Sequence, residues 1–204
     1  MGKVDKNKEL KENSLLKTAF EFFTTKGFSK TSISDIANKA GVAKGTFYLY
    51  FKDKYDIRNR LVSHKSSQLF RNAISALSPD SENICFEDKI IEIVDNIINQ
   101  LSNNHSLLTF ISKNLSWGVF KSALTSPPSE NDINFADIYY KMLEDAPCEF
   151  RDPEIMLFMI IELVSSTCYS AILYSEPCSL DELKPHLYDT IRLIIENHKQ
   201  KSKT

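Results

Sequence analysis

The chain has 204 residues, of which 42% are hydrophobic and 25% charged, so it is composed like an ordinary globular protein and unlike a disordered or fibrous one. The net charge of −2 is unevenly divided: residues 1–65 carry 14 Lys and Arg against 7 Asp and Glu, whereas residues 66–204 carry 11 against 20. A basic N-terminal third on an acidic remainder is expected where one end of a protein meets phosphates.

The ends and the cysteines indicate a cytoplasmic protein. The N-terminal sequence MGKVDKNKELKEN is charged and lacks the apolar stretch of a signal peptide. The four cysteines have no CxxC spacing, so we expect reduced and mostly buried thiols. These cysteines are Cys85, Cys148, Cys168 and Cys178.

The chain is expected to begin with a loose basic arm over residues 1–8, followed by a helix over residues 8–26. The buried stripe of this helix consists of Leu15, Leu16, Ala19, Phe20 and Phe23. Gly27 ends the helix, because glycine adopts a positive φ without strain, and Phe28 folds back into the core.

The stretch Thr31–Phe51 predicts two short helices with a tight turn between them. Ser32 is a good N-cap with Asp35 three residues on, which completes a capping box. Gly41 stands where a left-handed residue would stop the first helix. The second helix, Lys44–Phe51, buries two phenylalanines and leaves its polar side chains free. This is a helix-turn-helix, whose second helix enters the major groove of DNA.

The amino-acid sequence of this region resembles the N-terminal domain of the TetR (tetracycline-repressor-like) family over roughly Leu15–Ile57. The matching runs are Ala19–Phe23, Lys26–Phe28, Thr31–Ile33, Asp35–Ala37, Ala40–Val42, Lys44–Tyr48, Tyr50–Phe51 and Lys54. One position departs from the pattern. The family usually has Ser or Thr as the cap of the recognition helix, and this chain has Ala43. The change removes a side-chain cap worth about 1 kcal/mol.

The recognition helix and the joint after it supply the candidate DNA contacts. The candidates for base edges are Lys44, Gly45 and Tyr48. The candidates for phosphates are Thr46, Tyr50, Lys52 and Lys54. The matching positions of TetR-like proteins take these roles. The alternative for the two tyrosines is that they pack against the first helix.

The remainder predicts an all-α body. Asp53 is expected to cap a long helix that reaches Leu77. The further helices are expected over Phe86–Leu101, Ser106–Leu124, Phe135–Leu143, Glu154–Tyr174 and Leu180–His198. The apolar run Ile155–Tyr174 is interrupted by Glu162 and serines, and favours a buried helix over a membrane span. About nine helices result, in a DNA-binding domain over residues 1–52 and an effector-binding and dimerisation domain over residues 53–204.

The body contains more aromatic and methionine side chains than close packing requires, as pockets between helices do. The candidate ligand-binding residues are Phe110, Trp117, Phe120, Tyr139, Phe158, Met159, Glu162 and Tyr169. Two alternatives stand beside this prediction: the aromatic residues fill a dry core, and Glu162 faces a basic residue at the surface.

The last two helices of TetR-like proteins pair with those of a second subunit, and the apolar stripe of the final helix here agrees with that arrangement. The candidate dimer contacts are Leu183, Leu187, Ile191 and Ile194.

A ligand-responsive transcriptional regulator follows from these predictions, most simply a repressor that binds a palindromic operator as a homodimer and is released by a small apolar or aromatic effector. The sequence contains no GxSxG, HExxH, P-loop or GxGxxG motif, and its four histidines lack partners at metal-ligand spacing. We therefore expect no enzyme activity, no metal and no cofactor. The alternatives are an enzyme or carrier that uses the C-terminal pocket, and a structural DNA-binding protein without an effector.

Overall fold

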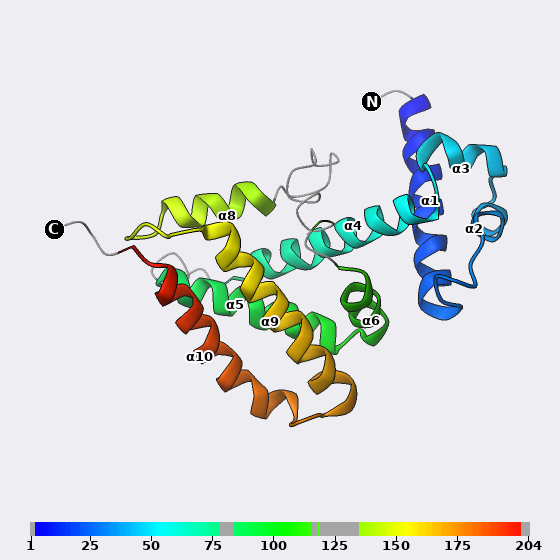
Figure 1. The fold of residues 1–204 in the computed structure, drawn as a ribbon. Coiled ribbons are helices and arrows are strands. Elements are labelled where there is room, and N and C mark those ends of the chain that lie inside the picture. The colour runs from blue at the N-terminus through cyan, green and yellow to red at the C-terminus, as the bar shows by residue number, and fades with distance from the viewer. Residues whose placement is uncertain (1–2, 78–83, 116–117, 119–134, 201–204) are drawn as a thin grey trace.

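The computed structural model describes residues 3–77, 84–115, 118 and 135–200. Within those ranges the chain is all-α, and the predicted fold class is confirmed. A small head of three helices is joined by a long helix to a larger helical body (Figure 1). The helices are α1 (Lys3–Thr25), α2 (Ile33–Lys39), α3 (Lys44–Tyr50), α4 (Lys54–Ser75), α5 (Phe86–Ser102), α6 (His105–Asn114), α8 (Phe135–Glu144), α9 (Pro153–Tyr174) and α10 (Leu180–His198).

Helix α1 starts earlier than the sequence predicts. Its first turn begins at Lys3, so the loose arm expected over residues 1–8 is wrong from that residue onward. The other end is as predicted. Gly27 takes a φ of +87°, and its backbone N–H donates to the carbonyl of Phe22. This bond closes the last turn, and Phe28 then packs against the core.

Helices α2 and α3 form the predicted helix-turn-helix. The Ser32 hydroxyl accepts from the backbone N–H of Asp35, and the Asp35 carboxylate accepts from the backbone N–H of Ser32. This is the reciprocal capping box. Gly41 has the expected positive φ, at +73°. Ala43 precedes α3 with no side-chain cap, as its methyl group dictates.

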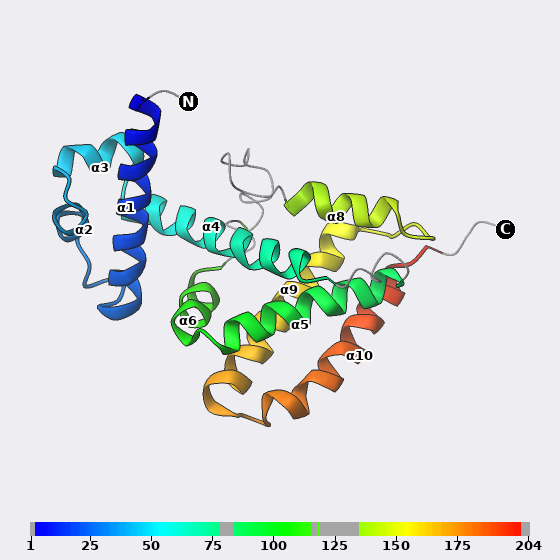
Figure 2. The same cartoon turned by 180° about the vertical axis from the view of Figure 1, so that it is seen from behind.

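Helix α4 connects the head with the body. Asp53 caps it by accepting from the backbone N–H groups of Tyr55 and Asp56, as predicted. The helix contacts α1 at the head and both α5 and α6 in the body. Seen from behind in Figure 2, it runs as one rod from the head to the far side of α5.

Helix α6 is shorter than predicted. It ends at Asn114, and Leu115 turns to extended backbone with a ψ of 117°. The Asn114 side chain donates to the carbonyl of Phe110, one turn back in the same helix, and the backbone N–H of Leu115 makes the last helical bond to the carbonyl of Ile111. The single helix expected over Ser106–Leu124 is therefore interrupted at Leu115, and residues 116–117 and 119–124 lie outside the described ranges.

Two hydrophobic clusters hold the protein together. One combines head and body: Leu15 and Phe22 of α1 and Phe47 of α3 share it with Leu61 of α4 and Leu108 of α6. The other lies within the body, among α5, α8, α9 and α10.

The second cluster overturns the predicted dimer contacts on α10. Leu187 and Ile191 are only 2% and 0% exposed, and Leu183 and Ile194 pack half-buried against the same core. The apolar stripe of α10 serves the protomer's own core, because α10 contacts both α5 and α9. Leu187 and Ile191 are therefore not available to a second subunit.

Polar side chains tie α10 to α5. Asp95 on α5 accepts from Lys184 at 2.7 Å and from the hydroxyl of Tyr188. Further along, the backbone of Lys199 and Gln200 runs beside Glu149–Arg151, where Gln200 N donates to the Glu149 carbonyl at 2.9 Å. Both ends of α10 are thus anchored.

Candidate nucleic-acid interface and ligand cavity

The recognition helix α3 presents the residues predicted to meet base edges. Lys44 and Gly45 are exposed, and Tyr48 is 52% exposed. Phe47 is fully buried and anchors the helix to the head. A methyl group added at Gly45 would meet nothing in the protein, so packing does not require glycine there. The open backbone at this position is suited to close approach by DNA.

The residues predicted to meet phosphates divide into two kinds. Lys52 is exposed and Thr46 is half-buried. Tyr50 packs half-buried against the head's core, which is the alternative that the sequence left open for it. Lys54 is engaged inside the protein: its ammonium donates to the carbonyls of Phe28 and Thr31 at 2.8 and 2.9 Å.

The position of Lys54 gives it a structural role that the sequence did not predict, beside the phosphate contact proposed for it. Its ammonium also lies 4.4 Å from the centre of the Phe28 ring, so the side chain ties the start of α4 to the turn between α1 and α2. Two of the three ammonium donors are used in this tie.

One exposed side chain of the recognition helix was missed. Leu49 is 79% exposed beside Tyr48, although leucine is usually buried in so small a domain. The spacing of the buried Phe47 and Phe51 contained the signal, because Leu49 is two residues from each and so lies about 200° around the helix from both.

A cavity of about 120 Å³ lies in the body between α4, α5, α6, α8 and α9. Its wall is almost entirely aliphatic and aromatic. The lining residues are Ser66, Leu69, Phe70, Ile74, Ile90, Ile93, Val94, Ile97, Leu101, Ile111, Leu115, Ile138, Tyr139, Met142, Leu157, Ile160, Ile161, Val164 and Ser165.

Three of these lining residues carry a hydroxyl group. Tyr139 is 4% exposed and donates to the carbonyl of Pro153 at 2.7 Å, and burial raises the pKa of its phenol well above the usual range. Ser165 is half-buried. Ser66, in the middle of α4, is 8% exposed, and its hydroxyl has no hydrogen-bond partner in the structure.

Six of the eight predicted ligand residues lie in the part of the chain that the structure describes, and of these six only Tyr139 lines the cavity. Phe110 packs on α1 instead, with its ring centre 5.3 Å from that of Phe20. Tyr169 is half-buried against the cluster shared by head and body. Trp117 and Phe120 lie outside the described residues.

The remaining three predicted residues face outward from α9. Phe158 and Met159 are 36% and 43% exposed, and Glu162 is exposed beside them. The prediction for this face is wrong because α9 is apolar on all sides, so helical periodicity cannot distinguish its cavity side from its outer side. Glu162 needs no buried partner, since its carboxylate reaches solvent.

The N-terminal region matches the family model described as "Bacterial regulatory proteins, tetR family" over residues 15–61. Residues 15–61 therefore form a DNA-binding region of the kind found in TetR-family regulators. This match covers α2, α3 and parts of α1 and α4, which are the elements that build the helix-turn-helix.

Relatives and solved structures extend the comparison. The chain is 32% identical to the "Fatty acid metabolism regulator protein" of Bacillus subtilis over 103 residues, which are 50% of this chain and 51% of that protein. It is 44% identical to the B. subtilis HTH-type transcriptional regulator YvdT over 63 residues, 29% of this chain and 32% of that one. The chain thus spans about half or less of the curated relatives that it matches.

A solved TetR-family structure shows that the likeness of fold reaches into the body. FadR of B. subtilis, solved in complex with stearoyl-CoA, has a TM-score of 0.60 at 20% identity, and the match covers 89% of this chain and 96% of that one. The whole described chain therefore has the fold of TetR-family proteins.

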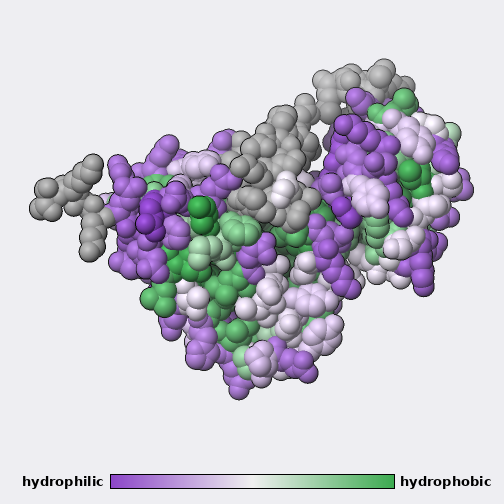
Figure 3. Space-filling view, viewed as in Figure 1, coloured by the Kyte–Doolittle hydropathy of each residue, from purple (hydrophilic) through white to green (hydrophobic). Residues whose placement is uncertain are grey.

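The exposed face of α9 stands out on this TetR-like body. Ile155, Phe158, Met159 and Tyr174 are exposed large apolar residues on α9, and Leu193 on α10 is 63% exposed. Figure 3 shows hydrophobic residues gathered over α9 and α10 on this side of the molecule. We name this surface the α9 outer face. The buried helix predicted here is buried on one side only in a single protomer.

Among the described helices, α9 alone is long and apolar enough to cross a membrane, but the core helices of globular proteins meet the same criterion.

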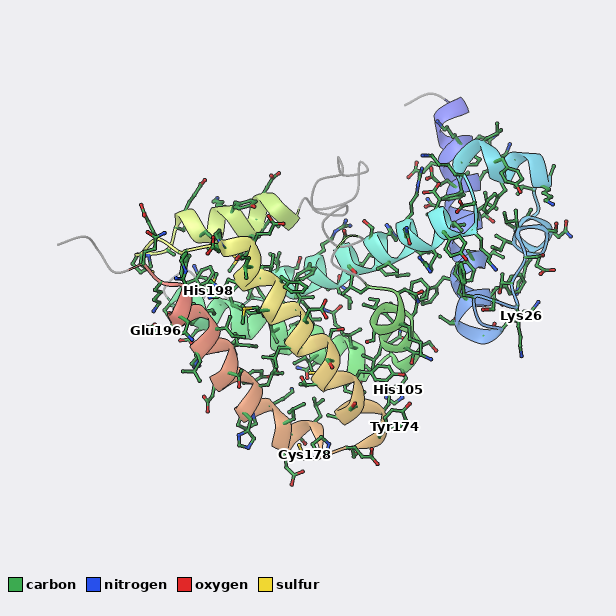
Figure 4. All side chains as sticks on the ribbon, viewed as in Figure 1. Lys26, His105, Tyr174, Cys178, Glu196 and His198 are labelled. Atoms are coloured by element: carbon green, nitrogen blue, oxygen red, sulfur yellow. The ribbon has the colours of Figure 1, made fainter. Side chains whose placement is uncertain are left out.

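Within the described ranges, no three His, Cys, Asp or Glu side chains cluster in a way that could hold a metal. His105 begins α6 and His198 ends α10, at opposite ends of the body (Figure 4).

All four cysteines are free, but only Cys168 is buried. The expectation of mostly buried thiols is therefore wrong. Cys85 and Cys178 precede helices, and Figure 4 shows Cys178 in the turn between α9 and α10. Turns of this kind run over the protein surface.

Proposed function

We propose that this protein is a ligand-responsive DNA-binding transcriptional regulator of the TetR family, a repressor that binds a palindromic operator as a homodimer. The observation that carries the proposal is the recognition helix α3, whose outward face is open while Phe47 and Phe51 hold its inner face. The basic N-terminal third supplies the charge for phosphate contact.

A second copy of the chain is the occupant that we propose for the α9 outer face. Phe158, Met159 and Leu193 would be covered there, and two heads would then read two half-sites related by one symmetry axis. The division that we propose is a DNA-binding domain over residues 1–52 and an effector-binding and dimerisation domain over residues 53–204.

An apolar small molecule is the effector that we propose for the cavity. The aliphatic lining supports it, and so does the similarity to a regulator of fatty acid metabolism and to a structure with stearoyl-CoA. The similarity to regulators, rather than to enzymes, supports a regulatory role for the cavity over a catalytic one.

Two routes lead from the cavity to the head. Helix α4 lines the cavity with Leu69 and holds the head through Lys54. Helix α6 lines it with Ile111, and its neighbour Phe110 packs on Phe20 of α1. A ligand that displaces either helix would change the distance between the two recognition helices. Adjacent major grooves on one face lie roughly 34–36 Å apart, so a small misfit would prevent simultaneous docking.

The experiment is a DNA-binding titration with the palindrome nearest to the protein's own gene and with a random duplex, each at several salt concentrations. Tyr48→Ala should lose more affinity on the palindrome than on the random duplex, because base contacts carry the specificity. Lys52→Ala should weaken both duplexes alike and reduce the salt slope by about 1. If the two variants behave identically, or if the wild-type protein binds both duplexes equally, the proposal fails.

The effector is tested by adding apolar compounds that bind the free protein to the complex with the palindrome. A coupling of about 1–3 kcal/mol would weaken DNA binding by roughly 5–150-fold. The ligand must bind the DNA-incompetent state more tightly, or it shifts nothing. Compounds that bind tightly and leave the palindrome affinity unchanged would show that the cavity is not the switch.

A further inference from the structure

The Ser66 hydroxyl is the buried polar group of the cavity wall that lacks a partner. Ser66 lies in the middle of α4 and is only 8% exposed. No backbone or side-chain group of the described protein forms a hydrogen bond with its hydroxyl oxygen. A buried hydroxyl without a partner costs free energy, so such groups are rare in native proteins. The hydroxyl is therefore available to a molecule in the cavity.

The rest of the wall restricts what that molecule can be. None of the lining residues is charged, and the Tyr139 hydroxyl is already engaged with the Pro153 carbonyl. A carboxylate or ammonium placed here would lose its hydration without a compensating ion pair, which is strongly unfavourable. The part of the ligand inside the cavity must be uncharged.

The size of the cavity sets the second restriction. Its volume of about 120 Å³ is slightly below the roughly 150 Å³ of an engineered apolar cavity that accepts benzene. One six-membered ring or a chain of similar volume fits, with little room for more. Among the lining hydroxyls, only that of Ser66 is both buried and without a partner, which favours one hydrogen-bonding atom on that group.

We propose that the cavity selects an uncharged, ring-sized apolar group that carries one neutral acceptor, such as a ketone or ester oxygen, to which Ser66 donates. The inference rests on the proposed function and names the chemistry of its effector. Because Ser66 belongs to α4, the hydrogen bond acts directly on the helix whose first turn holds the head through Lys54.

Three ligands of nearly equal shape test the proposal: isopropylbenzene, acetophenone and benzoate. They present an apolar group, a neutral carbonyl and a carboxylate at the same position of one ring. Calorimetric titration of the full-length protein should show acetophenone binding roughly 3- to 10-fold more tightly than isopropylbenzene, the effect of one neutral hydrogen bond. Benzoate should not bind measurably.

Ser66→Ala should abolish the preference for acetophenone and leave isopropylbenzene binding unchanged. It should also raise the thermal midpoint of the free protein, because it removes a buried hydroxyl without a partner. Ser165→Ala is the matched control. Its hydroxyl also lines the cavity but is not fully buried, and its loss should leave the preference intact.

Equal binding of isopropylbenzene and acetophenone to the wild-type protein, or a preference that survives Ser66→Ala, would overturn the proposal; in that case water satisfies the hydroxyl. Benzoate binding as tightly as acetophenone would overturn it as well. Release of the palindrome by both neutral ligands alike would leave the proposed function standing while this inference failed. Binding by none of the three would overturn the inference too.

Discussion

Lys52 and Lys54, at the joint between head and body, differ in their contacts. Lys52 is exposed, whereas Lys54 donates to two backbone carbonyls and lies over the Phe28 ring. Hydrogen bonds from a charged donor contribute more than neutral ones, and these two orient the head on α4. Lys52 is thus exposed to solvent, whereas Lys54, two residues later, is bound to the backbone of the head.

Lys54→Met is therefore expected to destabilise the protein by about 1–3 kcal/mol, because two carbonyls lose a charged donor while the apolar stem is kept. Urea unfolding monitored by circular dichroism measures the loss. Lys52→Met is the control and should leave the unfolding midpoint within error. An unchanged midpoint for Lys54→Met would mean that water replaces the ammonium at no cost, and that the tie does not hold the head.

The sequence predicted a phosphate role for Lys54 because a lysine in the first turn of a helix near DNA is well placed for one. Nothing in the spacing of residues 52–54 shows that the loop at Phe28 and Thr31 passes within reach of the ammonium. That contact depends on how α1 returns to α4, which is a tertiary feature. The capping residues Ser32 and Asp53, by contrast, act on backbone two or three positions away, and both were predicted correctly.

The contact between α5 and α10 depends on a carboxylate. Burial alone would raise the pKa of Asp95, but the hydrogen bonds from Lys184 and Tyr188 outweigh burial and leave the pKa below its usual value. The folded protein therefore binds a proton at Asp95 less readily than the unfolded chain does. The stability that follows is fully present above the unfolded pKa of about 3.9 and is lost as the pH falls below it.

Asp95→Asn is expected to lower the free energy of unfolding at pH 7 by about 1 kcal/mol, because Lys184 and Tyr188 lose a charged acceptor. The difference from the wild-type protein should shrink as the pH falls below about 4, where the wild-type carboxylate also becomes neutral. Urea unfolding between pH 3 and pH 7 measures both effects. Asp88→Asn, which removes an exposed pair with Arg192, is the control and should change little. A pH-independent difference would contradict the role of the charge.

Helix α9 shows how far sequence patterns reach at the scale of an element. Its bounds were predicted closely from Pro153 at the start and Pro177 beyond the end. Its orientation was not predictable, because apolar residues surround it and no polar stripe marks a solvent side. The stripe of α10 was correctly recognised as buried surface but assigned to a second subunit. A hydrophobic pattern predicts that one face of a helix is buried, but it does not show whether the same chain or a second subunit buries that face.

At the scale of the assembly, Phe158→Asp is expected to convert the proposed dimer into folded monomers. Phe158 is 36% exposed on a single protomer, so the charge is solvated in the monomer and would be buried without a partner in the dimer. Sedimentation velocity measures the mass, and circular dichroism shows that the fold is retained.

Two other substitutions make this assembly experiment decisive. Leu10→Asp, at a 65% exposed leucine of α1, should leave the dimer intact. Leu187→Asp, at a side chain that is 2% exposed, should unfold the protomer rather than dissociate it. A folded Phe158→Asp dimer would remove the α9 outer face from consideration.

Phe22 and Phe47 of the head share a hydrophobic core with Leu61 and Leu108 of the body. We therefore do not expect the head to fold as an independent domain. A fragment cut after residue 52 would leave one side of its own core open to water, and would not be expected to melt as an independent unit. A head transplanted onto the body of another regulator would need α4 and a matching α6 surface to travel with it. The recognition helix can diversify freely on its outer side, whereas α1 is bound on its inner side to the body that it serves.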